Sequence, residues 1–373
     1  MKKVLAFIDW YKPGYKAGGT VTAFSNFVEH LEDEFEFKIV TRNKDYCEDL
    51  TYENIVSDCW VIQSKISIYY LSEANVSFKK IKSIINNSSF DWIYINGIFS
   101  IFFSLIPVLL ASKKNFIVNP HGMLSEQAFS VKRFKKSVFL VFANLFSIYK
   151  NAIFHVANVE EAESVKKRIK CYKVIKVVNQ LPRKINSNFL NKPSVKNNPT
   201  RFICVSRISQ EKGILKMIKA FEKVKENLSL DIYGPIYDTQ YWKLCEIAIE
   251  KLPINIKVNY LGSIKGSEIP NLLKTYDYFI LLSEGENFGH AILEGLSAGL
   301  PIIISDQTPW KDLESKGIGW DINNESSKIP EIIELACTIS NENYSLMSIN
   351  CFKFAKDFCE NPKLLQANKK IFS

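Results

Sequence analysis

The chain has 373 residues, of which 47% are hydrophobic and 23% charged, which is typical of a soluble globular protein large enough for two cores. Its eight cysteines show no C-x-x-C pair and follow no signal peptide, which argues against a disulfide framework and favours a cytoplasmic protein. The net charge of +9 is uneven: residues 1–182 hold 24 Lys and Arg against 17 Asp and Glu, and residues 183–373 hold 24 against 22. The basic first half favours an anionic partner, although a merely soluble surface would show the same excess.

In the first half, short apolar runs alternate with helical stretches. The runs are VLAFID, FKIVT, ISIYYL, WIYINGI, FIVNP, IFHVAN and VIKVVN. Helical stretches such as residues 20–33, 78–87 and 159–169 separate them. Near-continuous apolar strands that alternate with helices predict a parallel sheet covered by helices on both faces.

Residues 183–200 interrupt this alternation. The stretch is rich in Asn, Pro and Lys and has no sustained periodicity, which is typical of a linker. The alternation restarts with RFICVS, LSLDIYG, INIKVNYLG, YFILLS and PIIIS. We therefore predict an α/β protein with two doubly wound, Rossmann-like domains, residues 1–182 and 201–355, which face each other across a cleft.

Two segments of the first half are strongly apolar. Residues 98–111 fall short of the ~18–20 residues that a membrane span needs, and Pro107 interrupts them, so we expect a buried helix. In residues 131–150 a basic stretch precedes an apolar helix. A core helix with a solvated first turn is the simpler interpretation, and an interfacial segment on an anionic membrane is the alternative. The cations of this stretch are Lys132, Arg133, Lys135 and Lys136.

Glycines and cations follow two of the predicted strands. Gly18 and Gly19 lead into a helix that begins near Thr20, where backbone N–H groups could approach a phosphate, although a plain strand-to-helix turn fits equally well. Arg207 and Lys212 follow the strand FICVS, which places both cations at the carboxyl edge of the second sheet. Arginine and lysine both bind phosphate, but solvated loop cations are also common.

The stretch SEGENFGHAILEGLSAGLPIIIS, residues 283–305, contains two acids eight residues apart. Glu286 lies in a loop after a buried strand, and Glu294 lies one to two turns into the following helix. A carboxylate accepts paired hydrogen bonds from vicinal hydroxyls, so both acids could hold sugar rings; each could also be an ordinary surface acid. The N–H groups of Phe288, Gly289 and His290 would point out of the helix N-terminus, where they would form an anion site.

The ordered set of these motifs resembles a known family. ENFGHAILE resembles the E-x7-E motif of GT4-family retaining glycosyltransferases, which have the GT-B fold, and GLPIIIS resembles the strand that follows this motif. GG at Gly18–Gly19, SRISQEKG at Ser206–Gly213 and DIYGP at Asp231–Pro235 match other landmarks in the family's order. NPHGML and SDQTPW resemble the bacterial subset that builds surface polysaccharides.

The resemblance implies roles for individual residues. Arg207 and Lys212 would clamp the donor diphosphate, Glu294 would hold the nucleotide ribose, and Glu286 would contact hydroxyls of the donor sugar. His121, after the fifth strand of the list above, would lie near the reacting carbon, although many members of the subset carry Arg there, and a histidine packed on the sheet edge is the simpler interpretation. The remaining donor-binding residues would be Gly18, Gly19, Asn287, Phe288, Gly289 and His290.

The resemblance also implies an activity and partners. The chain would be a metal-independent retaining glycosyltransferase without a cofactor, and its donor would be a UDP- or GDP-sugar. The acceptor would be a glycan or a polyprenyl-diphosphate-linked acceptor, bound to the first domain, in the synthesis of O-antigen, capsule or exopolysaccharide. The protein would be cytoplasmic, or peripheral on the inner face of the plasma membrane with an anionic membrane surface as a partner, and would have no nucleic-acid partner. Residues 356–373 would cross back onto the first domain. A non-hydrolysing nucleotide-sugar epimerase of the same fold, or a non-catalytic GT-B subunit, remains an alternative.

Overall fold

A computed structural model describes residues 1–111, 114–130, 133–184, 196–324 and 327–373. The chain divides into two compact units: unit 1 comprises Met1–Pro182 and Pro362–Ser373, and unit 2 comprises Arg183–Asn361. The chain thus leaves unit 1 after residue 182 and returns to it at residue 362. Of the predicted linker, residues 185–195 lie outside the described residues.

The described part of unit 1 contains an eight-stranded sheet in the order β3-β4-β2-β1-β5-β6-β7-β8. The seven predicted runs are all strands of this sheet, and they run parallel to one another. The sequence analysis missed β3 (Trp60–Gln63), a short antiparallel edge strand in which no residue is buried. The other strands are β1 (Lys2–Phe7), β2 (Phe35–Arg42), β4 (Ile66–Leu71), β5 (Trp92–Asn96), β6 (Phe116–Asn119), β7 (Ile153–Val156) and β8 (Val174–Val177).

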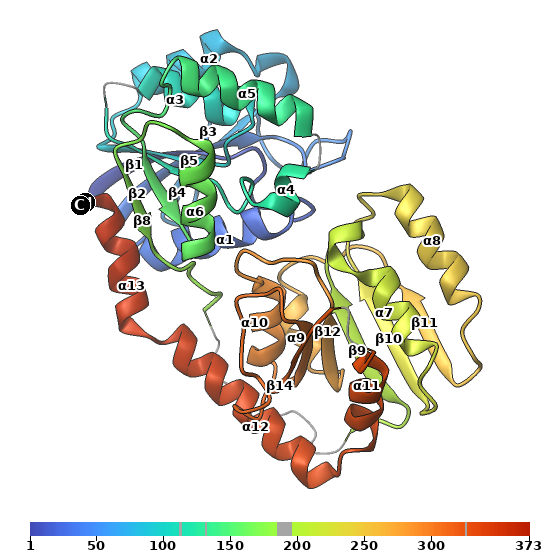
Figure 1. Ribbon diagram of the computed structural model, residues 1–373. Helices are drawn as coiled ribbons and strands as arrows, with labels where there is room; N and C mark the ends of the chain where they lie inside the picture. Colours follow the sequence, from blue (N-terminus) through green and yellow to red (C-terminus); the bar gives the residue numbers. More distant parts are fainter. Residues whose placement is uncertain (112–113, 131–132, 185–195, 325–326) are drawn as a thin grey trace. The chain divides into compact units, whose positions relative to one another are not determined.

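Helices cover both faces of this sheet, as the sequence predicts (Figure 1). α2 (Phe78–Asn87), α3 (Ile106–Ala111), α5 (Arg133–Leu145) and α6 (Val159–Arg168) pack on one face, and α1 (Gly19–Leu31) packs on the other. Shorter elements are η1 (Glu73–Asn75), the π-helical η2 (Ile101–Leu105) and α4 (Glu126–Ser130). The predicted helices near residues 20–33, 78–87 and 159–169 are confirmed within one or two residues at each end.

The predicted C-terminal helix 356–373 is two separate elements. α12 (Asn341–Cys359) ends unit 2, and α13 (Pro362–Lys369) with η4 (Lys370–Phe372) belongs to unit 1. The break fits Pro362, whose ring is tolerated at a helix start but not in a helix interior. The Phe372 ring lies 4.8 Å from the ring of Phe35 and 6.0 Å from that of Trp92, so the chain end completes the core beneath α1.

The described part of unit 2 contains a six-stranded parallel sheet in the order β11-β10-β9-β12-β13-β14. Five strands are the predicted ones, and the sequence analysis missed β14. That strand begins with Gly319, whose conformation (φ 142°) and close approach to the Ile302 carbonyl exclude a side chain, and a glycine weakens a strand pattern. The strands are β9 (Thr200–Val205), β10 (Leu228–Tyr233), β11 (Ile256–Tyr260), β12 (Tyr278–Leu281), β13 (Ile302–Ser305) and β14 (Gly319–Ile322).

Helices flank the second sheet and share one apolar core with it (Figure 1). The predicted helix after Gly289 is α10, which Gly299 closes with a left-handed conformation at φ 71°. The helices of unit 2 are η3 (Gln210–Lys212), α7 (Ile214–Phe221), α8 (Thr239–Ile249), α9 (Ile269–Leu273), α10 (His290–Ser297), α11 (Ile329–Thr338) and α12. Both units therefore have the doubly wound architecture that the alternation of strands and helices predicts.

The two apolar segments differ from their predicted form. Residues 98–111 form η2 and α3, which are largely buried, although Ile101 and Leu109 are exposed. In α5 only Leu140 and Ala143 are buried, so the prediction of a core helix is wrong for most of its apolar side chains. Residues 131 and 132, including the predicted cation Lys132, lie outside the described residues. Among the helices that the structure describes, none is both long and apolar enough to cross a membrane.

Candidate functional site

In unit 2 the predicted donor-site residues surround the topological switch point of the sheet. β9 and β12 are neighbours, and the chain proceeds from β9 towards β11 on one side and from β12 towards β14 on the other. The loop after β9 carries Arg207 and Lys212, and the loop after β12 carries Glu286. Ligands of open parallel sheets bind where two such loops diverge at the carboxyl ends of the strands.

Backbone contacts hold these two loops together. Gly213 ends η3 and caps α7 with φ 68°, and a Cβ there would lie 2.0 Å from the carbonyl oxygen of Leu282 at the end of β12. The Glu284 N–H donates to the Glu211 carbonyl at 2.8 Å. The close approach at residue 213 thus requires glycine both for space and for its positive φ.

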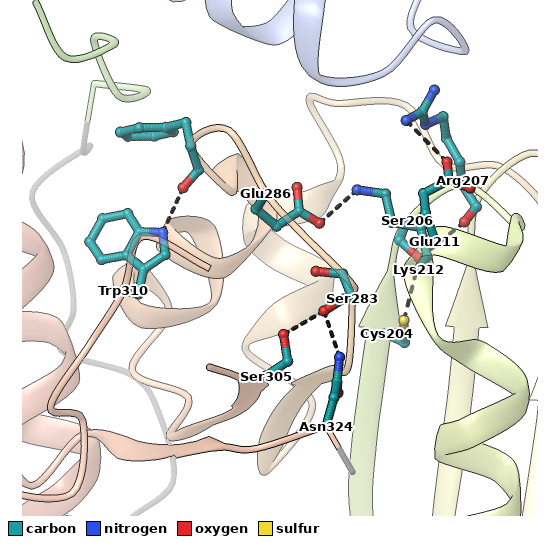
Figure 2. A network of polar contacts seen from close by, with 11 residues as sticks. Cys204, Ser206, Arg207, Glu211, Lys212, Ser283, Glu286, Ser305, Trp310 and Asn324 are labelled. Carbon is teal, nitrogen blue, oxygen red and sulfur yellow. Dashed lines mark hydrogen bonds and ion pairs between the residues drawn. The ribbon is translucent and has the colours of Figure 1, made fainter. Parts of the chain in front are cut away.

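Lys212 and Glu286 meet across these loops. The Lys212 Nζ lies 2.6 Å from the Glu286 Oε1, and the two side chains are 12% and 13% exposed (Figure 2). Cys204 lies beneath them in β9, where burial raises the pKa of its thiol to about 11 and both charges act on it. The pair that the resemblance assigns to phosphate and to sugar is therefore one shielded ion pair.

Arg207 is placed differently. Its guanidinium is 37% exposed, lies 3.6 Å from the Glu211 carboxylate and stacks 5.0 Å from the ring centre of Tyr237. Figure 2 shows Arg207 and Lys212 on the same β9 loop, each directed at its own acid. An exposed guanidinium with a weak partner can reorient towards an incoming anion more readily than a shielded ammonium.

The loop between Glu286 and α10 is fixed by Trp310. Its indole Nε1 donates to the Phe288 carbonyl at 2.6 Å, and its ring packs edge-on against the Phe288 ring (Figure 2). Gly289 is the N-cap of α10 at φ 82°, where a Cβ would lie 3.2 Å from the Trp310 Nε1. Asn287 lies in the same loop. No acid stands in the first turn of α10, so the positive end of the helix dipole is not neutralised there.

Glu294 has a partner that the sequence analysis missed. Arg183, the first residue of unit 2, donates from Nε to the Glu294 Oε1 at 3.0 Å, and its Nη2 forms an ion pair with the same oxygen at 2.9 Å. Burial raises the pKa of Glu294, and the Arg183 charge opposes that shift. Burial, with the nearby Arg183, lowers the pKa of His290 to about 3, so this imidazole stays neutral at physiological pH. Arg183 lay in a segment with linker composition, and no local pattern pointed to it.

The other predicted residues belong to unit 1, where each is described by itself. Gly18 is the N-cap of α1 with φ 76°, and α1 begins at Gly19, where a Cβ would contact nothing within 4 Å. The structure thus requires glycine at residue 18 for its backbone conformation, whereas residue 19 leaves open space above the start of the helix.

His121 follows β6 at the carboxyl edge of the first sheet. It adopts φ 51°, its ring Nε2 lies 2.9 Å from the Asn96 Oδ1, and its N–H donates to the Asn119 Oδ1 at 3.1 Å. A positive φ is uncommon for a residue that carries a side chain and persists only where the surrounding contacts hold it. The two asparagines therefore fix both the backbone and the ring of His121.

A second polar cluster at this edge was not predicted. Asp9 follows β1 and accepts hydrogen bonds from Ser100 at 2.9 Å and from Arg42 at 3.2 Å. Burial raises the pKa of the Asp9 carboxyl, and the Arg42 charge opposes the shift. β1 and β5 flank the switch point of the first sheet, so Asp9 and Ser100 occupy the position where this sheet would bind a ligand.

Comparisons with known proteins place this geometry in context. Residues 186–333 match the model of the family described as glycosyl transferases group 1. An uncharacterized glycosyltransferase of Methanocaldococcus jannaschii is 31% identical over 121 residues, 32% of this chain and 30% of that protein. The serotype-specific mannosyltransferase WbdA of Escherichia coli is 26% identical over 137 residues, 36% of this chain and 17% of WbdA. The chain thus matches less than a third of the length of either relative.

The fold extends over the whole chain. The crystal structure of HepE from Anabaena, in complex with UDP and glucose, superposes with a TM-score of 0.70, with 17% identity, and covers 100% of this chain and 98% of HepE. At this identity the likeness shows the fold alone. These findings confirm the predicted resemblance and the GT-B fold, and the match to glycosyl transferases group 1 lies within the second unit.

Proposed function

We propose that the chain is a retaining, metal-independent glycosyltransferase of the GT4 family that moves a sugar from a UDP- or GDP-sugar to a glycan acceptor. The observation that carries the proposal is the Lys212–Glu286 pair at the switch point of unit 2, with atoms 2.6 Å apart. In a nucleoside-diphosphate sugar the phosphate and the sugar are directly bonded. A cation for the phosphate and an acid for the sugar hydroxyls must therefore lie side by side, as Lys212 and Glu286 do.

In this proposal the reaction is a substitution at the anomeric carbon through an oxocarbenium-like state. Arg207, Lys212 and the N-terminus of α10 stabilise the charge that develops on the leaving diphosphate, because fixed positive groups are most effective where water is largely excluded. Glu286 favours the positive sugar ring, and Glu294 holds the ribose. No covalent glycosyl-enzyme is needed. His121 and the Gly18–Gly19 turn of unit 1 would contribute from the first sheet.

The acceptor we propose is polyprenyl-diphosphate-linked glycan, in the synthesis of a bacterial surface polysaccharide such as O-antigen, capsule or exopolysaccharide. Support comes from the motifs NPHGML and SDQTPW and from the similarity to WbdA, a serotype-specific mannosyltransferase. HepE, which shares the fold, was crystallised with UDP and glucose, which supports a nucleotide-sugar donor.

A panel of UDP- and GDP-sugars tests the proposal. We expect at least one to raise the melting temperature and to be hydrolysed slowly without acceptor. Accumulation of an isomeric nucleotide sugar from UDP-GlcNAc would favour the epimerase alternative instead. Nucleotide binding with no turnover under any condition would favour a non-catalytic subunit, and no binding at all would refute the proposal.

A further inference from the structure

The surface of α5 presents an apolar face to solvent. Six large apolar side chains on α5 and the turn after it are exposed, Phe134 at 81% and Leu145 at 74%, whereas Leu140 and Ala143 on the opposite side pack into the core. Spacings of three and four residues put the exposed six on one side of the helix. They are Phe134, Val138, Val141, Phe142, Leu145 and Phe146.

The basic excess of the chain falls in the sequence segment that contains this face. Residues 76–150 contain ten Lys and Arg against two Asp and Glu, a balance of +8, which accounts for the whole excess of the first half. α2 and α5 contain no acid at all. Both helices pack on the same side of the first sheet, with α3 (Figure 1). Exposed cations lie on both helices of this side of the sheet, Lys79 and Lys82 on α2 and Arg133 and Lys135 on α5.

The apolar face of α5 could be covered by a second copy of the chain or by a membrane, and the basic charge beside it favours the membrane. A second copy of the chain would cover the apolar side chains, but it would also bring two strongly basic surfaces into contact, and like charges oppose such pairing. Anionic lipid headgroups complement the cations while the apolar side chains enter the acyl boundary. We infer that α5, with the cations of α2, docks unit 1 on an anionic membrane surface. The inference does not depend on the transfer reaction.

Vesicle flotation tests the inference. The full chain should float with vesicles that contain phosphatidylglycerol, stay in solution with phosphatidylcholine alone, and be released by high salt. Val141→Asp with Leu145→Asp should abolish flotation. Arg133→Glu with Lys135→Glu should weaken partitioning roughly tenfold or more, because each Lys or Arg near such a surface contributes roughly fivefold.

Matched controls come from α8 and the turn after it in unit 2, which also expose apolar side chains and cations. Leu244→Asp with Ile247→Asp, and Lys243→Glu with Lys251→Glu, alter exposed side chains of the same kinds and should leave flotation unchanged. The inference is wrong if the wild-type chain stays in solution with anionic vesicles, or if the α5 variants float as it does. Sedimentation that shows a dimer dissociated by the α5 apolar variant, without a change in flotation, would identify the face as a self-interface.

A different observation, the Arg183–Glu294 contact, carries a second inference, which rests on the proposed function. The hydrogen bond from the Arg183 Nε and the ion-pair contact from its Nη2 both reach Oε1 of Glu294, and among the described residues no bond is seen to Oε2. The Arg183 Nη2 also lies where a Cβ on Gly266 would be 3.4 Å away, so the guanidinium fits between α10 and the loop after β11. The geometry points to Arg183 as a positioning residue that holds Glu294 so that Oε2 accepts a ribose hydroxyl.

Comparison of ribose and deoxyribose ligands tests this role. Arg183→Gln should weaken binding of UDP or GDP, whichever binds, roughly tenfold or more, since hydrogen bonds to charged groups are the strong ones. The same variant should bind the 2′-deoxy nucleotide almost as well as the wild-type chain does. Glu294→Gln should show the same two results, a loss of affinity for the ribose nucleotide and little change for the 2′-deoxy nucleotide. Arg183→Lys should restore part of the preference for ribose. Arg201→Gln, which alters an arginine 3.8 Å from Asp231, is the matched control and should change neither affinity.

The outcomes separate the inference from the function on which it rests. If the wild-type chain binds neither UDP nor GDP, the proposed function fails and this inference fails with it. If the wild-type chain and Glu294→Gln behave as expected but Arg183→Gln lowers both affinities equally, or neither, only the role of Arg183 is wrong.

Discussion

Glu286 and Glu294 lie eight residues apart in one motif, yet unit 2 holds them in different ways. Glu286 lies in a loop and meets Lys212 from the neighbouring loop, and both partners follow strands that flank the switch point. Glu294 lies on a helix and meets Arg183 from the start of the unit. Glu286 is paired with Lys212, which is proposed to bind phosphate, so Glu286 must share this lysine with the diphosphate when a donor binds. An acid paired with a residue outside the phosphate site keeps its partner, so its geometry is set before binding.

The largest effect should come from the glycine that brings the two loops together. Gly213→Ala puts a methyl group 2.0 Å from the Leu282 carbonyl at φ 68°, and should cost roughly 2–4 kcal/mol of stability. Thermal or denaturant unfolding measures this loss. Gly19→Ala is the control, because a Cβ there contacts nothing within 4 Å and the φ of Gly19 lies outside the left-handed range. Equal stability of the two variants would show that the loops are not held by this close approach.

The next largest effects should come from substitutions of the two cations in the β9 loop, Lys212 and Arg207, which should differ in their effect on stability. Lys212→Ala and Arg207→Ala should each weaken nucleoside-diphosphate binding by roughly 1.5–3 kcal/mol, as loss of a charge-assisted hydrogen bond does. Lys212→Ala alone should also lower stability, because it leaves the shielded Glu286 without its 2.6 Å partner, whereas Arg207 is 37% exposed. Calorimetry with UDP or GDP beside thermal unfolding gives both quantities. Unchanged nucleotide affinity in both variants would remove the pair from the site.

The two acids themselves give the direct comparison. Glu294→Gln should weaken the binding of free nucleoside diphosphate and of intact donor alike, since the role proposed for Glu294 is to hold the ribose that both ligands contain. Glu286→Gln should leave nucleoside-diphosphate binding nearly unchanged and lower turnover, because its charge favours the oxocarbenium more than the ground state. Calorimetry and steady-state rates separate these results. If Glu286→Gln weakens nucleotide binding as much as Glu294→Gln does, the division of roles is wrong.

The sequence carried most of the fold because strand–helix alternation is a local pattern. It also placed Lys212 and Glu286 at one site, because chain order alone puts the ends of β9 and β12 at the same sheet edge. It missed Arg183, since a contact between a linker-like residue and a helix depends on tertiary packing. The prediction for α5 was wrong for a related reason: the sequence of an apolar helix does not show whether a protein core or another surface covers it. The two missed strands are four residues long: β3 is an edge strand with no buried residue, and β14 begins with a glycine.

The smallest expected effect concerns the loop that joins the two acids. Trp310→Phe keeps the aromatic packing on Phe288 but removes the 2.6 Å hydrogen bond from Nε1 to the Phe288 carbonyl. Loss of one such bond should cost about 1 kcal/mol of stability. Because Gly289 and the start of α10 follow this carbonyl directly, the loop should loosen on the side of Glu286, whereas Glu294, held by Arg183, should not move. Turnover should therefore fall several-fold, with nucleoside-diphosphate affinity changed by less than about twofold. An affinity loss equal to the loss in turnover would show that the indole supports both acids and that the motif acts as one rigid piece.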